Sequence, residues 1–338
     1  MINIITYIFL FLLVILMNFF FLKKRIFLKF SGNTHQNFVG NDQVTLIGGI
    51  IIFIFFIFNF FATYNYFLIS MASFFILGIC ADYNFPKKPI TRFFLQVFLI
   101  MIFVSSFNLF VPSISIDFLD NFLQNKYFNL FFLIFCFIVL INGSNFIDGN
   151  NTLSLGYFIL LYSTIVQNEF LLPEELNQKF IISFIIVLSI LYFFNLINKV
   201  YLGDNGVYLL SVITGFILVK MYNLNLQISP FFIANLLWYP AFEGLFSFLR
   251  KVRIGNKSPL NADTSHLHQL IYFNLKRKIK NKVIRNGFTG NLINAYNFII
   301  FIIISQNISS AKFQVLCLLI SIFIYLIIYF YLYKKKKV

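Results

Sequence analysis

Charged residues are scarce in this chain, and their scarcity excludes most classes of protein. Only 11% of the 338 residues are charged, whereas ordinary soluble domains have roughly 25%. A soluble protein of this length would have too few charges to cover its surface. The composition therefore excludes a soluble globular enzyme, a disordered protein and a nucleic-acid-binding module.

Cysteines and acidic residues are also few. The three cysteines, Cys80, Cys136 and Cys317, lie in or beside apolar runs, without the spacing of a metal site or a disulfide framework. Only 11 residues are acidic, and the net charge is +15. The basic residues gather in a few clusters between apolar runs, which is typical of cytoplasmic loops in membrane proteins. We therefore expect no nucleic-acid partner.

Apolar residues are abundant: 60% of the chain is hydrophobic, and 51 residues are phenylalanine. A transmembrane helix needs roughly 20 apolar residues, or about 17 at the short end. We predict an all-α, polytopic integral membrane protein in which residues 1–338 form a single transmembrane domain. About eleven segments meet this criterion, at residues 3–22, 44–63, 65–80, 93–111, 127–142, 153–167, 179–197, 206–222, 229–249, 291–307 and 312–333.

The basic residues also predict how these segments are oriented, because Lys and Arg stay on the cytoplasmic side. Residues 23–25 are all basic and directly follow the first segment, so we expect a periplasmic N-terminus. Eleven spans then give a cytoplasmic C-terminus, and residues 250–290 become the largest cytoplasmic loop. The external side retains only a few basic residues, Lys126, Lys179, Lys220 and Lys312.

Three acidic residues on the predicted cytoplasmic side are candidates for chemistry. Asp82 follows the third segment, Asp148 lies in the amide-rich stretch NGSNFIDGNN, and Asp204 lies in KVYLGDNG. Carboxylates beside a membrane are costly and therefore point to function. Mg²⁺ takes one or two carboxylates, retains water and is completed by substrate phosphates. Three carboxylates at one membrane face, beside glycines, asparagines and basic residues, predict a magnesium-dependent phosphoryl-transfer site.

Each element alone has a simpler interpretation. A single D-G or G-D-N-G is typical of a turn. His266 and His268 are two residues apart and do not share a helix face, so we expect no zinc site. Glu243 is expected to be a structural partner of a basic loop residue.

Five sequence elements occur in the order of a known family. They are His35 followed by Gly48-Gly49; Gly78 to Asp82 with Arg92 and Gln96; Asn142-x-x-Asn145-x-x-Asp148-Gly149; Asn195 with Lys199, Gly203, Asp204 and Gly206; and Glu243, Arg250, Ser258-Pro259, Asp263 and His266-x-His268. In this order they resemble the polyprenyl-phosphate N-acetylhexosamine-1-phosphate transferases of glycosyltransferase family 4. That superfamily includes undecaprenyl-phosphate GlcNAc-1-phosphate transferases and, more distantly, phospho-MurNAc-pentapeptide translocase. The resemblance extends from about residue 35 to residue 270.

The resemblance implies an activity and a location. A sugar-1-phosphate would pass from a UDP-N-acetylhexosamine, with UDP-GlcNAc as first choice, to undecaprenyl phosphate, and UMP would leave. This step would start lipid-linked glycan synthesis, of O-antigen lipopolysaccharide or a cell-wall polysaccharide. It would take place at the cytoplasmic face of a bacterial inner membrane. Mg²⁺ is the implied cofactor, with Mn²⁺ as an alternative, and a homodimer is compatible with the family.

The resemblance also implies residue roles. Asp82, Asp148 and Asp204 would be catalytic, with Asp204 the principal metal ligand, Asp148 a second one, and Asp82 orienting metal-bound water, phosphate or the nucleotide. The implied substrate-binding residues are His35, Arg92, Asn142, Asn145, Lys199, Gly203, Asn205, His266 and His268.

Four residues depart from the family pattern. Ala81 replaces the first Asp of a D-D pair, Asn151 replaces an acid after D-G, Thr45 replaces a proline, and Gln269 replaces a third histidine. A polyprenyl phosphate is already largely dianionic at neutral pH, so it needs little help from a base. Two alternatives stay open: an inactive homologue with a structural role, and a transporter or flippase whose acids would form an ion path at mid-membrane depth.

Overall fold

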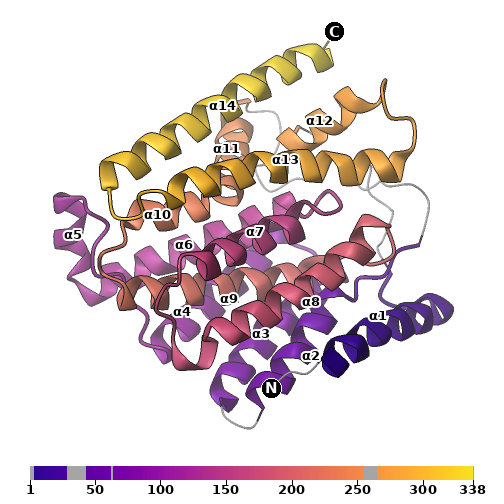
Figure 1. Ribbon diagram of the computed structural model, residues 1–338, viewed down its shortest axis with the longest axis horizontal. Helices are drawn as coiled ribbons and strands as arrows, with labels where there is room; N and C mark the ends of the chain where they lie inside the picture. Colours follow the sequence, from indigo (N-terminus) through magenta and orange to yellow (C-terminus); the bar gives the residue numbers. More distant parts are fainter. Residues whose placement is uncertain (1–3, 29–42, 62–63, 255–264, 338) are drawn as a thin grey trace.

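The apolar segments of the sequence are helices in the computed structural model. The structure describes residues 4–28, 43–61, 64–254 and 265–337 (Figure 1). Its helices are α1 (Ile4–Lys24), α2 (Gly48–Phe60), α3 (Asn65–Asp82), α4 (Pro89–Ser106), α5 (Asp117–Leu123), α6 (Lys126–Ile147), α7 (Leu153–Gln167), α8 (Gln178–Leu196), α9 (Gly203–Leu224), α10 (Pro230–Leu236), α11 (Trp238–Ile254), α12 (Leu267–Leu275), α13 (Lys282–Ser305) and α14 (Ala311–Lys337), with a 3₁₀ turn at Glu174–Leu176. Within these described residues there is no β-strand, only two isolated bridges that join Thr45 to Leu28 and to Val200. The predicted all-α class is confirmed.

Eight of the described helices are long and apolar enough to cross a membrane: α1, α3, α4, α6, α8, α9, α13 and α14. The predicted segment 229–249 consists of α10 and α11, which meet at a bend of 74°. Two other predicted segments form the shorter apolar helices α2 and α7, of 13 and 15 residues. These helices indicate a membrane protein, and the count of eleven spans stays a prediction.

The bend between α10 and α11 has a local cause. The backbone leaves helical geometry at Leu237, whose φ and ψ are −111° and 2°. Pro240 follows in the first turn of α11 and has no N–H to continue the hydrogen bonds of α10. The bend directs α11 along α6, where Gly143 lies so close that a Cβ atom would overlap the Pro240 carbonyl oxygen.

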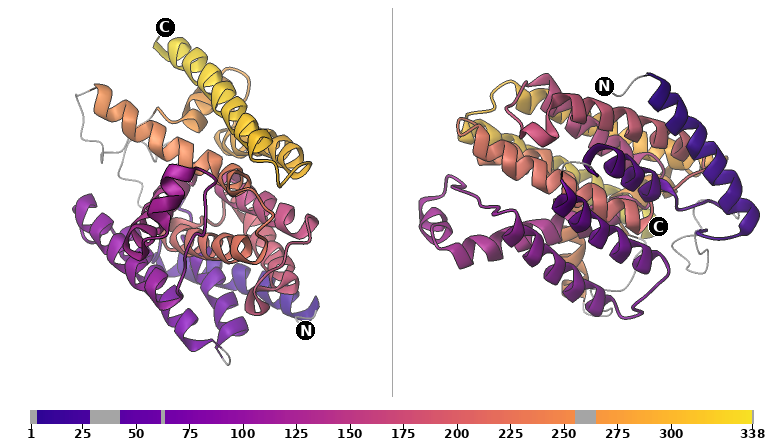
Figure 2. Two further views of the ribbon diagram at one scale, coloured as in Figure 1. Left: turned by 90° about the vertical axis from the view of Figure 1, so that its left-hand side faces the viewer. Right: turned by 90° about the horizontal axis from the view of Figure 1, so that it is seen from below.

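Helix α9 is the centre of the bundle. In the apolar stretch of α9, 78% of the residues are buried, compared with 11% in α1 and 22% in α14. It packs against α2, α3 and α6. Helices α1 and α14 lie on opposite outer edges (Figures 1 and 2). Their outward Phe, Leu and Ile side chains form the kind of surface that contacts lipid rather than water.

Segments far apart in the sequence meet at one end of α9. Gly48 N–H donates to the Tyr201 carbonyl over 3.0 Å, and Tyr201 N–H donates to the Thr45 carbonyl over 2.8 Å. A Cβ atom on Gly49 would overlap Asn205, and one on Gly78 would overlap the backbone of the same asparagine. These glycines therefore let the start of α2 and the end of α3 lie directly against the start of α9.

The predicted loop 250–290 is largely helical where the structure describes it. It contains the end of α11, all of α12 and the beginning of α13, which starts at Lys282 rather than at residue 291. The Asn281 side chain caps α13 by accepting from Val283 N and Ile284 N. Arg285 is buried and donates to Tyr272 Oη over 2.7 Å. Polar groups thus find partners that a hydropathy pattern does not reveal.

Candidate active site

Asp82 caps the beginning of α9 although it belongs to α3. Its Oδ1 accepts from Asp204 N over 2.8 Å, and its Oδ2 accepts from Asn205 N over 3.1 Å and also from Asn205 Nδ2. The first N–H groups of a helix lack partners within the helix and attract anions. The carboxylate of Asp82 occupies this position, so it fixes the turn that carries Asp204.

Asp204 is half-buried and is held from a third helix. Asn145 of α6 donates from Nδ2 to Asp204 Oδ1 over 2.6 Å. Gly203, just before Asp204, has a φ of +74°, in the left-handed region that glycine adopts without strain. We call Asp82, Asn145 and Asp204 the carboxylate centre. It unites three of the five sequence elements.

A row of polar side chains extends from the carboxylate centre towards α4. Asn142, one turn before Asn145, donates to Gln96 Oε1 over 3.1 Å. Gln96 is buried, and the hydroxyl of Tyr208 on α9 lies near it. Arg92 is half-buried and acts electrostatically on the same tyrosine. The predicted residues Arg92 and Asn142 therefore lie on one side of the carboxylate centre.

The carboxylate centre is suited to a magnesium ion whose coordination shell is completed by substrate phosphates. Mg²⁺ usually binds one or two protein carboxylates, several waters and substrate phosphates. The described residues contain no cluster of three or more His, Cys, Asp or Glu side chains that would form a complete protein cage. Asp82 and Asp204 are neighbours in space, and a divalent cation would offset the repulsion between their charges. Asp148 lies one helical turn beyond Asn145, the residue that holds Asp204.

The end of α6 connects this centre to the histidines. Asp148 is the C-cap of α6, and Gly149 follows it. His268 lies directly against Gly149, where a Cβ atom would be 2.8 Å from Nε2 of the histidine. Burial, together with the charge of His266, lowers the pKa of His268 to about 3, with Glu243 acting in the opposite direction. His268 is therefore neutral at physiological pH.

A buried acid holds the other histidine. Glu243 of α11 is fully buried, and its Oε1 lies 2.9 Å from His266 Nδ1. Because an ionised carboxylate only accepts, Nδ1 of His266 carries the proton of this contact. Tyr325 of α14 donates to Glu243 Oε2 over 2.6 Å. We call Glu243, His266 and His268 the histidine centre. The rings of its two histidines stack with centroids 5.5 Å apart.

Two of the four departures from the family pattern have a structural explanation. Gln269 accepts from His266 N over 3.1 Å and thereby supports the first turn of α12. Asn151 donates to Asn198 Oδ1 over 3.2 Å and accepts from Asn286 Nδ2 over 2.9 Å. A carboxylate at 151 would lose the donor and face the Asn198 oxygen in a buried place.

The structure shows where the other two departures, Thr45 and Ala81, lie, but it does not explain them. Thr45 donates to Asn18 Oδ1 over 2.8 Å. Ala81 is buried beside Asp82, and nothing in the structure explains this substitution.

Not all predicted site residues come together. Asn205 is fully buried and donates to both Leu46 O and Asp82, so it supports the turn from inside. Lys199 is exposed. His35, Ser258, Pro259 and Asp263 lie outside the described residues.

The sequence interpretation missed three residues that the fold brings to the site. They are Tyr208, Lys251 and Tyr325. Lys251 is buried, with its Nζ 5.7 Å from the centre of the Phe146 ring, which in turn lies 5.1 Å from the His266 ring. For the two tyrosines, the sequence offered only one indication of a role in the site: each places a hydroxyl group among the apolar residues of its helix, α9 or α14.

Replacement of Tyr325 by Phe is expected to lower the free energy of unfolding by about 1.5–3 kcal/mol, the usual value of a hydrogen bond to a charged group. The change leaves the buried Glu243 carboxylate with one partner fewer. The matched control is Tyr331→Phe on the same helix, because Tyr331 is 65% exposed. Chemical denaturation of the purified protein measures both changes. Equal stability of the two variants would show that Tyr325 does not support Glu243.

Comparison with known families identifies the central part of the chain. Residues 64–222, just under half of the chain, match the family model described as glycosyl transferase family 4. The matched range contains the whole carboxylate centre and ends before the histidine centre. A comparison with curated proteins found no match. The match confirms the family resemblance predicted from the sequence: over residues 64–222 the chain is similar to glycosyl transferase family 4, the family of polyprenyl-phosphate sugar-1-phosphate transferases.

Proposed function

We propose that the protein transfers a sugar-1-phosphate from a UDP-N-acetylhexosamine, with UDP-GlcNAc as the first candidate, to undecaprenyl phosphate. UMP would be released, and the lipid-linked product would start the synthesis of an O-antigen or cell-wall polysaccharide. The reaction would take place at the cytoplasmic face of a bacterial inner membrane. One observation carries the proposal: Asp204 is fixed by Asn145 and, through the α9 cap, by Asp82, within a family-matched segment.

The proposed reaction is a single exchange at phosphorus. An oxygen of the lipid phosphate forms a bond to the sugar-bearing β-phosphorus of the nucleotide sugar. The bond from that phosphorus to the bridging oxygen breaks, and UMP leaves with the bridging oxygen. Catalysis of this kind depends on alignment and on stabilisation of charge.

The residues divide these tasks. Asp204 and Asp148 would hold Mg²⁺, or Mn²⁺ in its place, and the bound ion would neutralise charge on the diphosphate. Asp82 keeps the turn of Asp204 in place, so we propose it as a positioning residue rather than a free base. Asn142, Arg92 and Lys199 would contact phosphate or nucleotide, and neutral His268 would offer one hydrogen-bond donor and one acceptor to the substrate.

The placement of the acids also bears on the transporter alternative. An ion path would need acids at the middle of the membrane. Asp82 ends α3, Asp148 follows α6 and Asp204 begins α9. Acids at helix ends favour the transferase, whose substrates carry their charge at the membrane surface.

Release of UMP tests the proposed function. Membranes that contain the protein would be supplied with undecaprenyl phosphate, Mg²⁺ and one of several UDP-sugars. We expect release with a UDP-N-acetylhexosamine, and no release when either Mg²⁺ or the lipid is omitted. Absence of release with every donor, from folded protein, would instead support an inactive homologue. An Ala81→Asp variant that then gained activity would identify residue 81 as the cause.

A further inference from the structure

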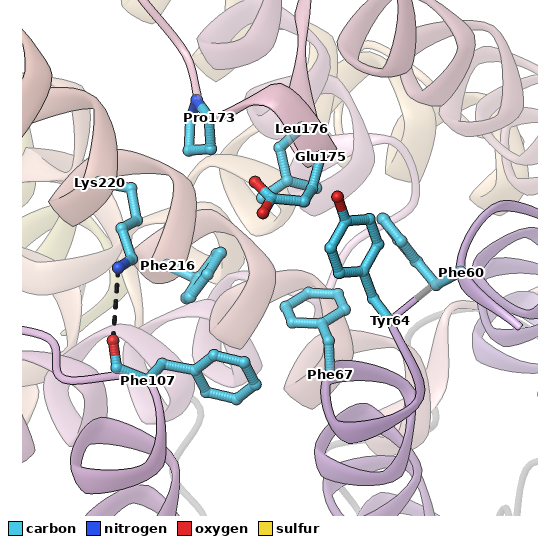
Figure 3. A pocket seen from close by; sticks show the side chains of 9 residues that line it. All are labelled: Phe60, Tyr64, Phe67, Phe107, Pro173, Glu175, Leu176, Phe216 and Lys220. Carbon is cyan, nitrogen blue, oxygen red and sulfur yellow. Dashed lines mark hydrogen bonds between the residues drawn. The ribbon is translucent and has the colours of Figure 1, made fainter. Parts of the chain in front are cut away.

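A cavity of about 170 Å³ lies far from the carboxylate centre, and neither the sequence elements nor the proposed reaction uses it. It opens where α2 and α4 end, where α3 begins and where the 3₁₀ turn precedes α8 (Figure 3). Lys220 of α9 lines it, sixteen residues after Asp204. At 1.5 Å per residue this places the cavity roughly 24 Å along the helix from the carboxylate centre. That separation approaches the hydrocarbon thickness of a bilayer, about 30 Å.

The walls of the cavity are mostly aromatic. The ring of Phe67 lies 5.0 Å from that of Phe60, 5.8 Å from that of Phe107 and 5.3 Å from that of Phe216, measured between centroids. Tyr64 extends this wall, with its ring 6.3 Å from the Phe60 ring. The faces of aromatic rings attract organic cations. The cavity is therefore suited to a group that carries a positive charge on a short carbon chain.

Two opposite charges also line the cavity. The carboxylate of Glu175 points towards the middle of the cavity, and Lys220 lies at the wall opposite Tyr64 (Figure 3). Lys220 Nζ donates to the Phe107 carbonyl over 3.3 Å and lies 5.8 Å from the centre of the Phe216 ring. In the described part of the chain these two charges do not form an ion pair with each other. Each therefore retains capacity for a ligand of opposite charge.

The surroundings indicate that this ligand comes from the membrane. Phe61 is 69% exposed and Tyr66 is 84% exposed, and both lie beside the cavity-lining residues of α2 and α3. Exposed aromatic side chains at helix ends are typical of the boundary between lipid and water. The cavity is also too small for acyl chains, which would remain in the bilayer.

We propose that this cavity binds the headgroup of an aminophospholipid, phosphatidylethanolamine, from the leaflet opposite to the carboxylate centre. The ammonium would lie against Glu175 and the aromatic wall, and the phosphate would meet Lys220. The headgroup is a zwitterion whose ammonium and phosphate are opposite in charge to Glu175 and Lys220, respectively. A short ethanolamine chain separates its two charged groups. The site is distinct from the proposed transfer reaction, and its test does not require enzymatic activity.

Lipid binding to the purified protein tests this site. Short-chain phosphatidylethanolamine, phosphatidylglycerol and phosphatidylcholine would each be titrated against the full chain in detergent, with bound lipid counted by native mass spectrometry. We expect preferential binding of phosphatidylethanolamine. Glu175→Gln and Lys220→Met should each weaken this binding by about fivefold, the loss that accompanies removal of one solvent-accessible charge pair. Lys220→Arg retains the positive charge and should bind the lipid like the original protein. It therefore serves as a control that separates loss of charge from a folding defect in Lys220→Met.

The chain supplies matched controls. Glu174 and Lys179 are exposed residues of the same surface and do not line the cavity. Glu174→Gln and Lys179→Met should therefore leave binding unchanged. Equal binding by Glu175→Gln and Glu174→Gln would overturn the proposal. So would equal binding of phosphatidylglycerol, which would indicate a simple anion site, or equal binding of soluble glycerophosphoethanolamine, which would indicate a ligand from the water phase.

Discussion

Replacement of Asp204 by Asn is expected to lower the rate of UMP release by at least about 100-fold, the usual cost of losing one charge-stabilising group. The amide retains an oxygen that can accept from Asn145, so the geometry of the centre is preserved while the negative charge is lost. A cation held by this carboxylate would bind less tightly. The loss should therefore affect chemistry rather than folding.

The measurement is the initial rate of UMP release at saturating donor and lipid, over a range of Mg²⁺ concentrations. Asp117→Asn is the matched control, because Asp117 is an exposed acid of α5. It should retain the original rate. A rate of Asp204→Asn within a few-fold of the original would remove Asp204 from the proposed metal site.

Replacement of Asp82 by Asn should reduce both activity and stability. The carboxylate accepts from Asp204 N, Asn205 N and Asn205 Nδ2, and an amide presents a donor in place of one of its oxygens. Each N–H that loses its partner in a buried place costs about 1–3 kcal/mol. The turn that carries Asp204 would then shift. Mutation of a residue that orients a metal ligand typically lowers metal affinity by about 10- to 100-fold.

This variant distinguishes a positioning role from a base. If Asp82 positions Asp204, the melting temperature falls and the Mg²⁺ concentration for half-maximal activity rises by about 10-fold or more. If Asp82 acts as a base on the lipid phosphate, the rate falls while the melting temperature and the Mg²⁺ dependence stay unchanged. Tyr83→Phe is a suitable control, since it changes only the hydroxyl of an exposed neighbour. The second pattern would contradict a positioning role for Asp82.

Much of the site was predictable from the sequence because its parts are local. Asp82, Asp148 and Asp204 each lie at the end of an apolar run, so hydropathy alone brings them to helix ends. Gly203 next to Asp204 predicts a tight turn, and its φ of +74° agrees with this. The expectation that Glu243 serves as a structural partner was also close, although its basic partner is His266.

The links between these parts were not predictable. The contact of Asp82 with the start of α9 joins residues 122 positions apart, and that of Tyr325 with Glu243 joins residues 82 positions apart. A hydropathy pattern predicts which face of a helix is buried, but it does not predict which residue a particular polar atom will contact. For the same reason α12 and the start of α13 were expected as loop, since their buried polar residues resemble those of a solvated segment.

The sequence by itself predicted that this protein lies in a membrane and where its helices end. It could do so because the burial of an apolar segment in lipid depends only on its length and composition. It also determined the chemistry available at those ends, in the carboxylates, amides and histidines of the five elements. Tertiary structure decided which of these groups act together. Close approach at Gly49, Gly78 and Gly143 sets the distances between helices, and those distances bring Asn145 to Asp204, Asp82 to the start of α9, and His268 to Gly149.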